Sequence, residues 1–181
     1  GAEIISQFDR FDVIIEHDGT KINVDQFDNY VTQMIAVSKD TDTEKITTGV
    51  FADSQGEIHH IPTVIKVLDN QYYAEISSFY PGMETFLIWN TKTFEDVNNH
   101  WSKDAVNDMG SRLVINGVDN INFEPDCDIT RAEFTAIVIR ALGLNPGEGD
   151  NIFEDVDTDD WYCEYVKTAH KYGIILGYGK Q

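Results

Sequence analysis

The chain has 181 residues, of which 41% are hydrophobic, and this globular composition leads us to expect two modest folded units rather than disorder. Acidic residues outnumber basic ones by 15 to 5 in residues 1–90 and by 17 to 8 in residues 91–181, which gives a net charge of -19. This balance excludes nucleic acid as a partner, because no basic stripe can neutralise phosphates, and the short apolar runs exclude membrane insertion, which needs about 20 apolar residues.

The first expected element is a β-hairpin near the N-terminus. Residues 11–16 and 20–24 are rich in apolar and β-branched side chains, and they flank Asp18-Gly19. That dipeptide suits a type I′ turn, which requires two positive φ angles. Residues 25–37 follow, and their apolar side chains fit both helical spacing and strand alternation. For that segment we favour a strand.

A second hairpin is expected further along the first half. Residues 64–68 and 72–76 are β-branched or aromatic, and Asp69-Asn70 separates them. Together these patterns predict a small antiparallel β-rich module over residues 1–92. The sequence implies no ligand for this module.

From about residue 93 the chain repeats itself. The matches fall at an offset of 59 at first and 60 afterwards, which one inserted residue explains. The matching pairs are Phe94-Glu95-Asp96-Val97 with Phe153-Glu154-Asp155-Val156, Trp101 with Trp161, Val106 with Val166, and Val114-Ile115-Asn116-Gly117 with Ile174-Ile175-Leu176-Gly177. Agreement at several separated positions indicates a duplicated structural unit, so we expect one unit at 93–151 and a second at 152–181.

Each unit is predicted to be a helix, a glycine-containing loop and a second helix. In the first helix, apolar residues fall at every fourth position: Trp101, Ala105, Met109 and Leu113. The second helix should begin with Thr130 and Glu133 as a capping box and should stop at Gly143. Its predicted apolar stripe is Phe134, Ile137, Val138, Ala141 and Leu142. The expected fold class is therefore α+β, with the β-rich module followed by all-α repeats.

The repeated region resembles the S-layer homology domain. The blocks that carry the resemblance are Phe94-Glu95-Asp96-Val97, His100-Trp101, Asn116-Gly117, Phe123-x-Pro125, Ile129-Thr130-Arg131-Ala132-Glu133-Phe134 and Arg140-Ala141-Leu142-Gly143-Leu144. It covers residues 93–145 fully and 152–181 in part. The family typically has three repeats, whereas this sequence has one and a half and ends before a counterpart of the capping box.

The resemblance implies a function in non-covalent anchoring. Proteins with such repeats are held on secondary cell-wall polysaccharide, often pyruvylated, so the implied location is extracellular and associated with the cell wall or S-layer. It implies no catalysis and no cofactor. The net negative charge opposes long-range approach of an anionic polymer, so affinity must come from a local site and from several repeats acting together.

Arg131 is the leading candidate for binding the polysaccharide. Its cation stands in the first turn of a predicted helix, where the macrodipole disfavours positive charge. One interpretation is an ion pair with Asp126, Asp128 or Glu133, which physics alone favours. The other is an acidic sugar substituent held between the guanidinium and the free amides of the helix start. The resemblance favours this second role, because the family's matching arginine is implicated in polymer binding.

Three further positions are predicted to contact the polysaccharide, each with a structural alternative. Trp101 and its equivalent Trp161 can stack on sugar rings, although their place on the apolar stripe favours core packing. Asp96 can bind sugar hydroxyls, although capping or bracing of a loop is favoured. Gly117 provides either a positive φ or a close backbone approach. For Glu133 and Thr130 we expect structural capping rather than binding.

The sequence gives no support for catalysis or a metal site. His59-His60 lacks a spaced third ligand, and no nucleophile or phosphate-loop motif occurs. Asp155-x-Asp157-x-Asp159 begins like a calcium loop, but Asp160 stands where the turn glycine belongs. Cys127 and Cys163 lack metal spacing, and we favour two free thiols over a disulfide.

A different class of function is a protein-assembly module without glycan affinity of its own. The half unit would leave the stripe that includes Tyr165 and Ala169 short of a partner helix. A homo-oligomer or a domain swap through the incomplete repeat would then cover it.

Overall fold

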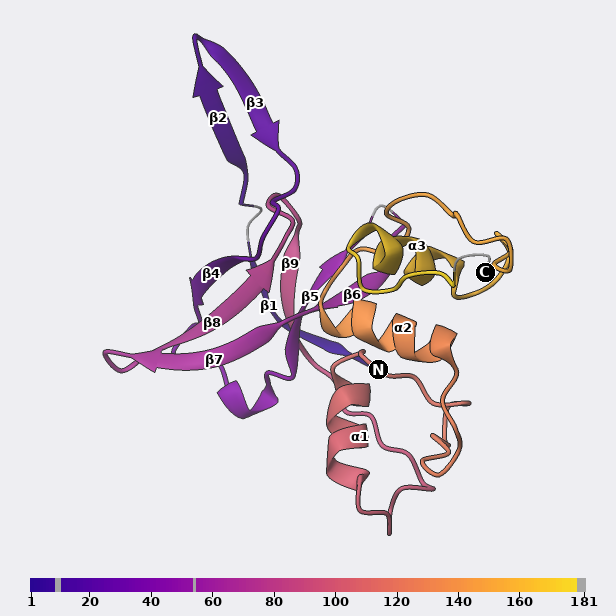
Figure 1. Ribbon diagram of the computed structural model, residues 1–181. Helices are drawn as coiled ribbons and strands as arrows, with labels where there is room; N and C mark the ends of the chain where they lie inside the picture. The colour runs from indigo at the N-terminus through magenta and orange to yellow at the C-terminus, as the bar shows by residue number, and fades with distance from the viewer. Residues whose placement is uncertain (9–10, 54, 179–181) are drawn as a thin grey trace.

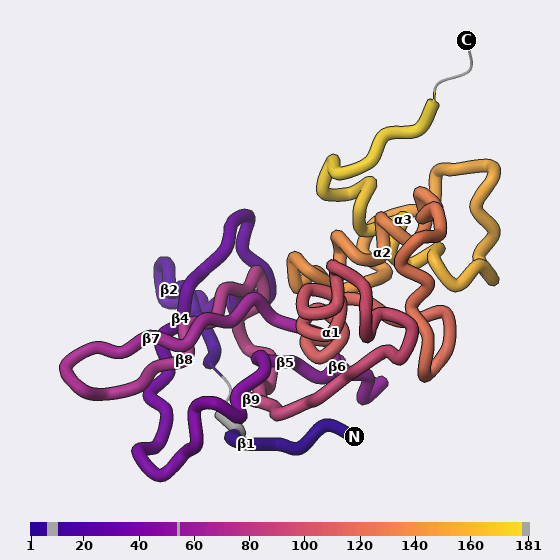
Figure 2. Tube along the Cα trace, turned by 90° about the horizontal axis from the view of Figure 1, so that it is seen from below, coloured from indigo at the N-terminus to yellow at the C-terminus, as the bar shows by residue number. Residues whose placement is uncertain are grey.

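The computed structural model describes residues 1–8, 11–53 and 55–178, so the last three residues of the predicted half unit lie outside the described residues. All strands in this part of the chain precede residue 90, and all α-helices follow residue 102 (Figure 1). The three helices are grouped on one side of the β-strands (Figure 2). The β-rich first half is confirmed.

Three antiparallel sheets make up the first half. The four-stranded sheet has the order β1 (Glu3–Phe8), β9 (Thr85–Trp89), β5 (Thr48–Ala52) and β6 (Ile58–Ile61). The three-stranded sheet has the order β4 (Val31–Ala36), β8 (Gln71–Ser78) and β7 (Thr63–Leu68). The two-stranded sheet pairs β2 (Val13–His17) with β3 (Thr20–Val24). A short 3-10 helix, η1 (Thr43–Lys45), precedes β5.

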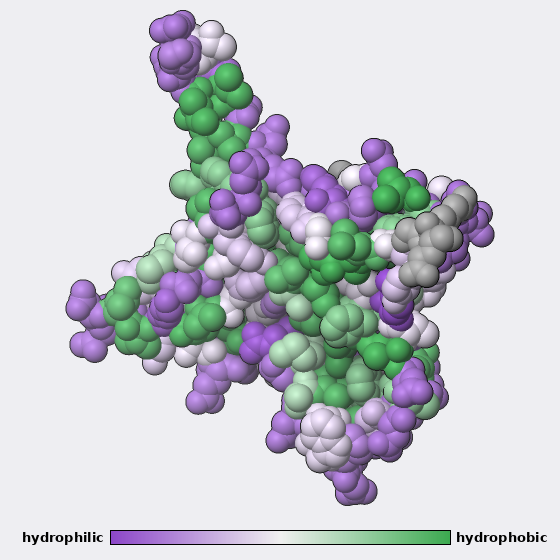
Figure 3. Space-filling model, in the orientation of Figure 1, coloured by the Kyte–Doolittle hydropathy of each residue, from purple (hydrophilic) through white to green (hydrophobic). Residues whose placement is uncertain are grey.

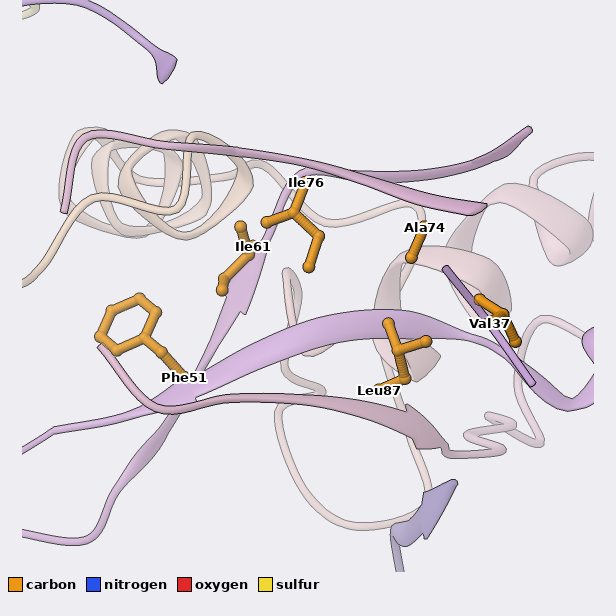
Figure 4. Close-up of a cluster of buried hydrophobic side chains, with 6 residues drawn as sticks. All are labelled: Val37, Phe51, Ile61, Ala74, Ile76 and Leu87. Carbon is orange, nitrogen blue, oxygen red and sulfur yellow. The ribbon is translucent and has the colours of Figure 1, made fainter. Parts of the chain in front are cut away.

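The core of this half lies between the two larger sheets. Pro62 alone separates β6 from β7, so the chain passes there from one sheet to the other. Side chains from both sheets then meet in one buried cluster (Figure 4), whose members are Val37, Phe51, Ile61, Ala74, Ile76 and Leu87. Burial of such a cluster is the main favourable term that holds a sandwich of two sheets together.

Both predicted hairpins are confirmed. Asp18 and Gly19 have φ of 49° and 76° in the β2–β3 turn, and Asp69 and Asn70 have φ of 50° and 60° in the β7–β8 turn. Paired positive φ values are those of a type I′ turn, whose twist matches that of the strands. The strand predicted within residues 25–37 is β4. The β2–β3 hairpin projects from the body, and apolar side chains cover much of its visible face (Figures 1 and 3).

The predicted all-α character of the repeats is wrong. The second half contains α1 (Lys103–Ser111), α2 (Arg131–Ala141) and α3 (Cys163–Lys171), and most of its other described residues are in turns and loops. Among the regular elements of the described residues, β-strands predominate over α-helices. The helices are short because the segments between them leave the helical region of φ and ψ, as Leu113 and Glu124 do with φ of 64° and 61°.

The internal duplication is visible in the structure as well as in the sequence. Helices α1 and α3 begin and end 60 positions apart. Val106 and Val166 are buried at equivalent positions, 7% and 6% exposed. Beyond the two helices, Leu113 and Gly173 both take positive φ, 64° and 68°. Positions 60 residues apart therefore share their backbone conformation as well as their place in the sequence repeat.

The helices pack against the β-rich module. Gly143 follows α2 with φ of 62°, as predicted, and a Cβ there would lie 2.7 Å from Cδ of Pro62. A buried cluster of Ile139, Leu144 and Ala169 contacts Phe79 of the β-rich module. The apolar face of α3 is thereby covered within the chain. None of the described helices has the length and apolar character needed to cross a membrane.

Candidate functional site

Two grooves flank helix α2. The first, of about 600 Å³, lies between the first turns of α2 and the second repeat, and we name it the Arg131 groove. Its lining includes Arg131, Thr135, Phe153, Asp155, Gly177 and Tyr178. The second, of about 580 Å³, is named the Gly117 groove, and its lining includes Gly117, Phe123, Glu133, Ile137, Arg140 and Trp161.

Arg131 is the first residue of α2 and is exposed. Its guanidinium carbon lies 4.7 Å from the centre of the Tyr178 ring, a cation–π contact. Among the residues described by the structure, no carboxylate forms an ion pair with Arg131. The guanidinium is therefore held against an aromatic face with its hydrogen-bond donors available.

The capping box beside Arg131 explains why Glu133 does not neutralise it. The Thr130 hydroxyl accepts the Glu133 amide at 3.2 Å, and one Glu133 oxygen accepts the Thr130 amide at 2.8 Å and its hydroxyl at 2.6 Å. These hydrogen bonds lower the pKa of the Glu133 carboxyl. The carboxylate and the Glu133 amide are thus both engaged in the cap, while the amides of Arg131 and Ala132 at the helix start have no intrahelical backbone acceptor.

Gly117 allows a close backbone approach. A Cβ at this position would lie 2.2 Å from the Asn122 carbonyl oxygen and 2.5 Å from Cε1 of Phe94. Its φ is not positive, so of the two predicted roles the close approach is the one observed. The equivalent Gly177 lies against Phe153, where a Cβ would be 2.7 Å from Cε1. The same glycine–phenylalanine contact therefore shapes both grooves.

Asp96 and Trp101 are not in the lining of either groove. The Asp96 carboxylate accepts the amides of Phe123 at 2.9 Å and Glu124 at 2.6 Å, and so braces a loop. Trp101 is 90% exposed and contacts His100, with ring centres 5.3 Å apart, so its predicted core packing is wrong. Arg131, Gly117, Asp96 and Trp101 are therefore not brought together in one place.

Sequence reasoning missed the aromatic residues around Arg131. Tyr178 contacts its guanidinium, and Phe153 and Tyr162 line the same groove. The repeat offset was the available signal, because Phe153 and Gly177 are equivalent to Phe94 and Gly117. Arg140 was missed as well. It donates from Nε to the Tyr165 hydroxyl at 3.1 Å, and its guanidinium carbon lies 4.7 Å from that ring.

The two cysteines and the acidic side chains are candidates for reactive or metal-binding arrangements. Cys127 is exposed and Cys163 is buried, and both are free thiols, as favoured from the sequence. A hydrogen bond to Glu124 raises the pKa of the Cys127 thiol, which makes it a poorer nucleophile. No three His, Cys, Asp or Glu side chains in the described ranges are arranged to hold a metal ion.

Comparison with known proteins confirms the family resemblance of the second half. Residues 93–135 and 152–181 match the S-layer homology domain. The chain is similar to endo-1,4-beta-xylanase A of Thermoanaerobacterium saccharolyticum, with 41% identity over 88 residues, which are 49% of this chain and 8% of that protein. It is similar to the S-layer protein sap of Bacillus anthracis, with 33% identity over 90 residues, which are 49% of this chain and 11% of that protein.

A third relative extends the range of protein types. Amylopullulanase of Thermoanaerobacterium thermosulfurigenes is 39% identical over 89 residues, which are 49% of this chain and 5% of that protein. The chain thus spans only about a twentieth to a ninth of the length of these curated relatives. No solved structure matches the chain.

Proposed function

We propose, from the S-layer homology sequence in residues 93–135 and 152–181, that this chain anchors a surface protein non-covalently to bacterial cell-wall polysaccharide. The shared segment occurs in S-layer proteins and in large proteins named as polysaccharide-degrading enzymes. A segment common to such different proteins fits attachment better than catalysis. The proposed location is therefore extracellular and associated with the cell wall.

The Arg131 groove is the observation that carries the binding proposal. An acidic substituent on the polymer, such as a pyruvyl group, would accept charge-assisted hydrogen bonds from the Arg131 guanidinium. The amides and the positive dipole end of α2 would stabilise the same negative charge. The Tyr178 ring, 4.7 Å from the guanidinium carbon, favours the side-chain orientation that places the guanidinium in this groove.

Local geometry has to overcome the charge of the whole chain. The net charge of -19 opposes the approach of an anionic polymer. The Arg131 guanidinium has no ion-pair partner among the described residues, so the electrostatic potential close to it can be positive although the chain as a whole is negative. Several weak sites on one polymer then raise the effective concentration of each, which increases total affinity.

The test is sedimentation of the chain with purified bacterial cell walls, before and after their secondary polymer is extracted. We expect binding to intact walls only. Arg131→Ala should weaken it on the order of tenfold, the usual worth of a hydrogen bond to a charged group. Arg112→Ala is the matched control, because Arg112 pairs with Asp108 at 2.9 Å and is not in the lining of either groove. Equal binding to extracted walls would overturn the proposal.

The assembly alternative makes a different prediction about mass. A homo-oligomer or domain swap was expected to cover the stripe of α3, yet Ala169 is already buried against Ile139 and Phe79. Light scattering across a range of concentrations should then give the mass of one chain. A concentration-dependent dimer that ignores wall polymer would favour assembly over anchoring.

A further inference from the structure

A third groove lies where the β-rich module meets the repeats. It has a volume of about 490 Å³, and we name it the β5–β6 groove. One wall comes from the β5–β6 hairpin, with Glu57 in the turn and His59 in β6. The repeats supply the other wall, with Arg140, Trp161 and Tyr165. The end of the β5–β6 hairpin lies beside α3 and α2 in Figure 1.

The β5–β6 groove adjoins the Gly117 groove. Arg140 and Trp161 line both, so a single extended ligand can contact the two grooves across these side chains. Trp161 is 58% exposed, although its ring is supported by Tyr162 and Tyr165 at centroid distances of 5.5 Å and 6.4 Å. A large apolar ring that is held in place but uncovered is suited to stack against the C–H face of a sugar.

The arginine in this groove is also positioned in advance. The Tyr165 hydroxyl accepts a hydrogen bond from Nε of Arg140, and the Tyr165 ring faces the guanidinium. No carboxylate in the described ranges forms an ion pair with Arg140. The terminal nitrogens of the guanidinium are thus available as donors to a hydroxyl or an amide carbonyl.

The opposite wall is braced by hydrogen bonds and presents a carboxylate that has no ion-pair partner among the described residues. Asp53 accepts the amides of Gln55 at 2.8 Å and Glu57 at 2.9 Å, and it pairs with His59 Nε2 at 2.9 Å. The His59 ring in turn stacks on Phe51, with centroids 5.1 Å apart. Asp53 is therefore occupied in bracing the turn. Glu57 is exposed and forms no ion pair with any described residue.

We propose that the β5–β6 groove is a second glycan subsite, in which Trp161 stacks on an uncharged sugar ring while Glu57 and Arg140 hydrogen-bond its hydroxyl groups. This inference rests on the proposed anchoring function and deepens it. Three carboxylates, Asp53, Glu57 and Glu164, line this groove, and its arginine lies in the last turn of α2, where the helix dipole disfavours an anion. Two carboxylates, Glu154 and Asp155, line the Arg131 groove, but Arg131 lies at the start of the helix, where the dipole favours an anion. The Arg131 groove takes the acidic substituent, and the β5–β6 groove takes a neutral residue of the same polymer.

The proposal gives the β-rich module a direct part in binding. The repeats alone supply only one wall of this subsite, because the opposite wall belongs to β5–β6. Preorganisation on that wall by the Asp53–His59 pair limits the entropy lost when a sugar binds. Neutralising Glu57 of the β-rich module should therefore weaken binding, even though the repeats are unchanged.

Isothermal titration with secondary polymer released from bacterial cell walls tests the subsite. A second sample of this polymer is treated with mild acid, which removes ketal-linked acidic groups. We expect Trp161→Ala to weaken binding about fivefold and Glu57→Gln about threefold, on both samples. Trp161→Phe keeps a stacking ring and should retain most of the affinity. Tyr72→Ala and Glu44→Gln are matched controls, because both residues are exposed and outside the three grooves.

The outcomes separate this inference from the anchoring proposal. If Arg131→Ala weakens binding to untreated polymer while Trp161→Ala and Glu57→Gln do not, the second subsite is wrong and anchoring stands. If the unaltered chain binds neither sample, both proposals fail. An effect of Trp161→Ala equal to that of Tyr72→Ala would also overturn the subsite, because general loss of an exposed aromatic ring would explain it.

Discussion

Arg131 is available for binding because its neighbours are already engaged. Glu133, the nearest acid on the same helix turn, is bound to the Thr130 amide and hydroxyl. The Asp96 carboxylate is likewise occupied, because it accepts hydrogen bonds from the amides of Phe123 and Glu124. Both carboxylates satisfy donors of the chain, and Arg131 has no ion-pair partner among the described residues, as the anchoring proposal requires.

A single buried residue, His60, should make the stability of the fold depend on pH. It is 6% exposed and bonds to the Thr48 hydroxyl at 2.8 Å, and burial, with a smaller effect of Arg112, lowers its pKa to about 4. The folded chain therefore keeps His60 neutral, whereas the unfolded chain protonates it below its ordinary pKa of about 6.5. Stability is full above that pH and falls towards pH 4, by roughly 3 kcal/mol.

Urea denaturation at pH 7 and pH 4.5 measures this effect. The His60→Gln variant keeps a hydrogen-bonding group and should lose about 2 to 3 kcal/mol less than the unaltered chain between the two pH values. Carboxyls with lowered pKa values, such as those of Asp53 and Glu148, lose their contribution at lower pH and are common to both proteins. Equal losses in the two proteins would contradict the assignment to His60.

At the scale of the element, local chemistry was predictable and the buried faces were not. Asp18-Gly19, Asp69-Asn70 and the capping box of α2 are set by a few adjacent residues, and all are present in the structure. The buried face of α2 is Thr135, Ala136 and Ile139, whereas the predicted stripe included Phe134, which is 58% exposed. Which helix face is buried depends on the neighbouring element, here β6 and α3, and periodicity contains no information about that neighbour.

The predicted first helix shows the same limit. Trp101 and Leu113 were placed on its apolar face, yet α1 spans only Lys103–Ser111 and buries Val106 and Gly110. Leu113 lies beyond the helix with φ of 64°. The four-residue spacing of apolar side chains therefore extends past the last helical residue, and this spacing alone does not locate the end of the helix. The short helices and long loops have their stability from packing rather than from helical propensity.

The loops between helices give a prediction about Gly117. Its added Cβ would meet the Asn122 and Asp119 carbonyl oxygens at 2.2 Å and 2.6 Å, so backbone would have to move. Gly117→Ala should cost about 2 kcal/mol of the free energy of unfolding, typical of overpacking, and distort the Gly117 groove. Gly1→Ala is a control, because a Cβ there meets nothing within 4 Å. Equal denaturation midpoints for the two variants would show that this loop relaxes at little cost.

At the scale of the whole molecule, a polar network joins the β-rich module to the second repeat. The Glu148 carboxylate accepts hydrogen bonds from the Tyr80 and Tyr172 hydroxyls and from Lys171. Burial would raise the pKa of Glu148, but the hydrogen bonds from Lys171 and Tyr80 outweigh it and lower the pKa. Tyr80 also accepts the Asn145 amide at 3.0 Å. The division into units 1–92, 93–151 and 152–181 remains a proposal about the sequence. In the folded chain these hydrogen bonds connect all three units.

Sequence reasoning had no access to this network. Tyr80 and Glu148 are 68 positions apart and belong to no motif, so only the folded chain brings them together. The same holds for the β5–β6 groove, whose walls come from the two halves of the chain. By contrast, the duplication and the capping box beside Arg131 could be read directly, because each depends on residues close in sequence or on a fixed offset.

Glu148→Ala tests whether the two halves behave as one body. It leaves the buried Tyr80 hydroxyl and the partly exposed Lys171 ammonium without their acceptor, so we expect a loss of about 2 kcal/mol in the free energy of unfolding. Amide hydrogen exchange should rise both in α3 and in β8, on either side of the network. Exchange that rises in α3 alone would show that the module and the repeat are not coupled through this carboxylate.

The most direct test of the account is calorimetric titration of released cell-wall polymer into the unaltered chain and into Arg131→Ala. We expect saturable binding by the unaltered chain, a loss of affinity on the order of tenfold in Arg131→Ala, and unchanged affinity in Arg112→Ala. Indistinguishable affinities for the unaltered chain and Arg131→Ala would contradict it.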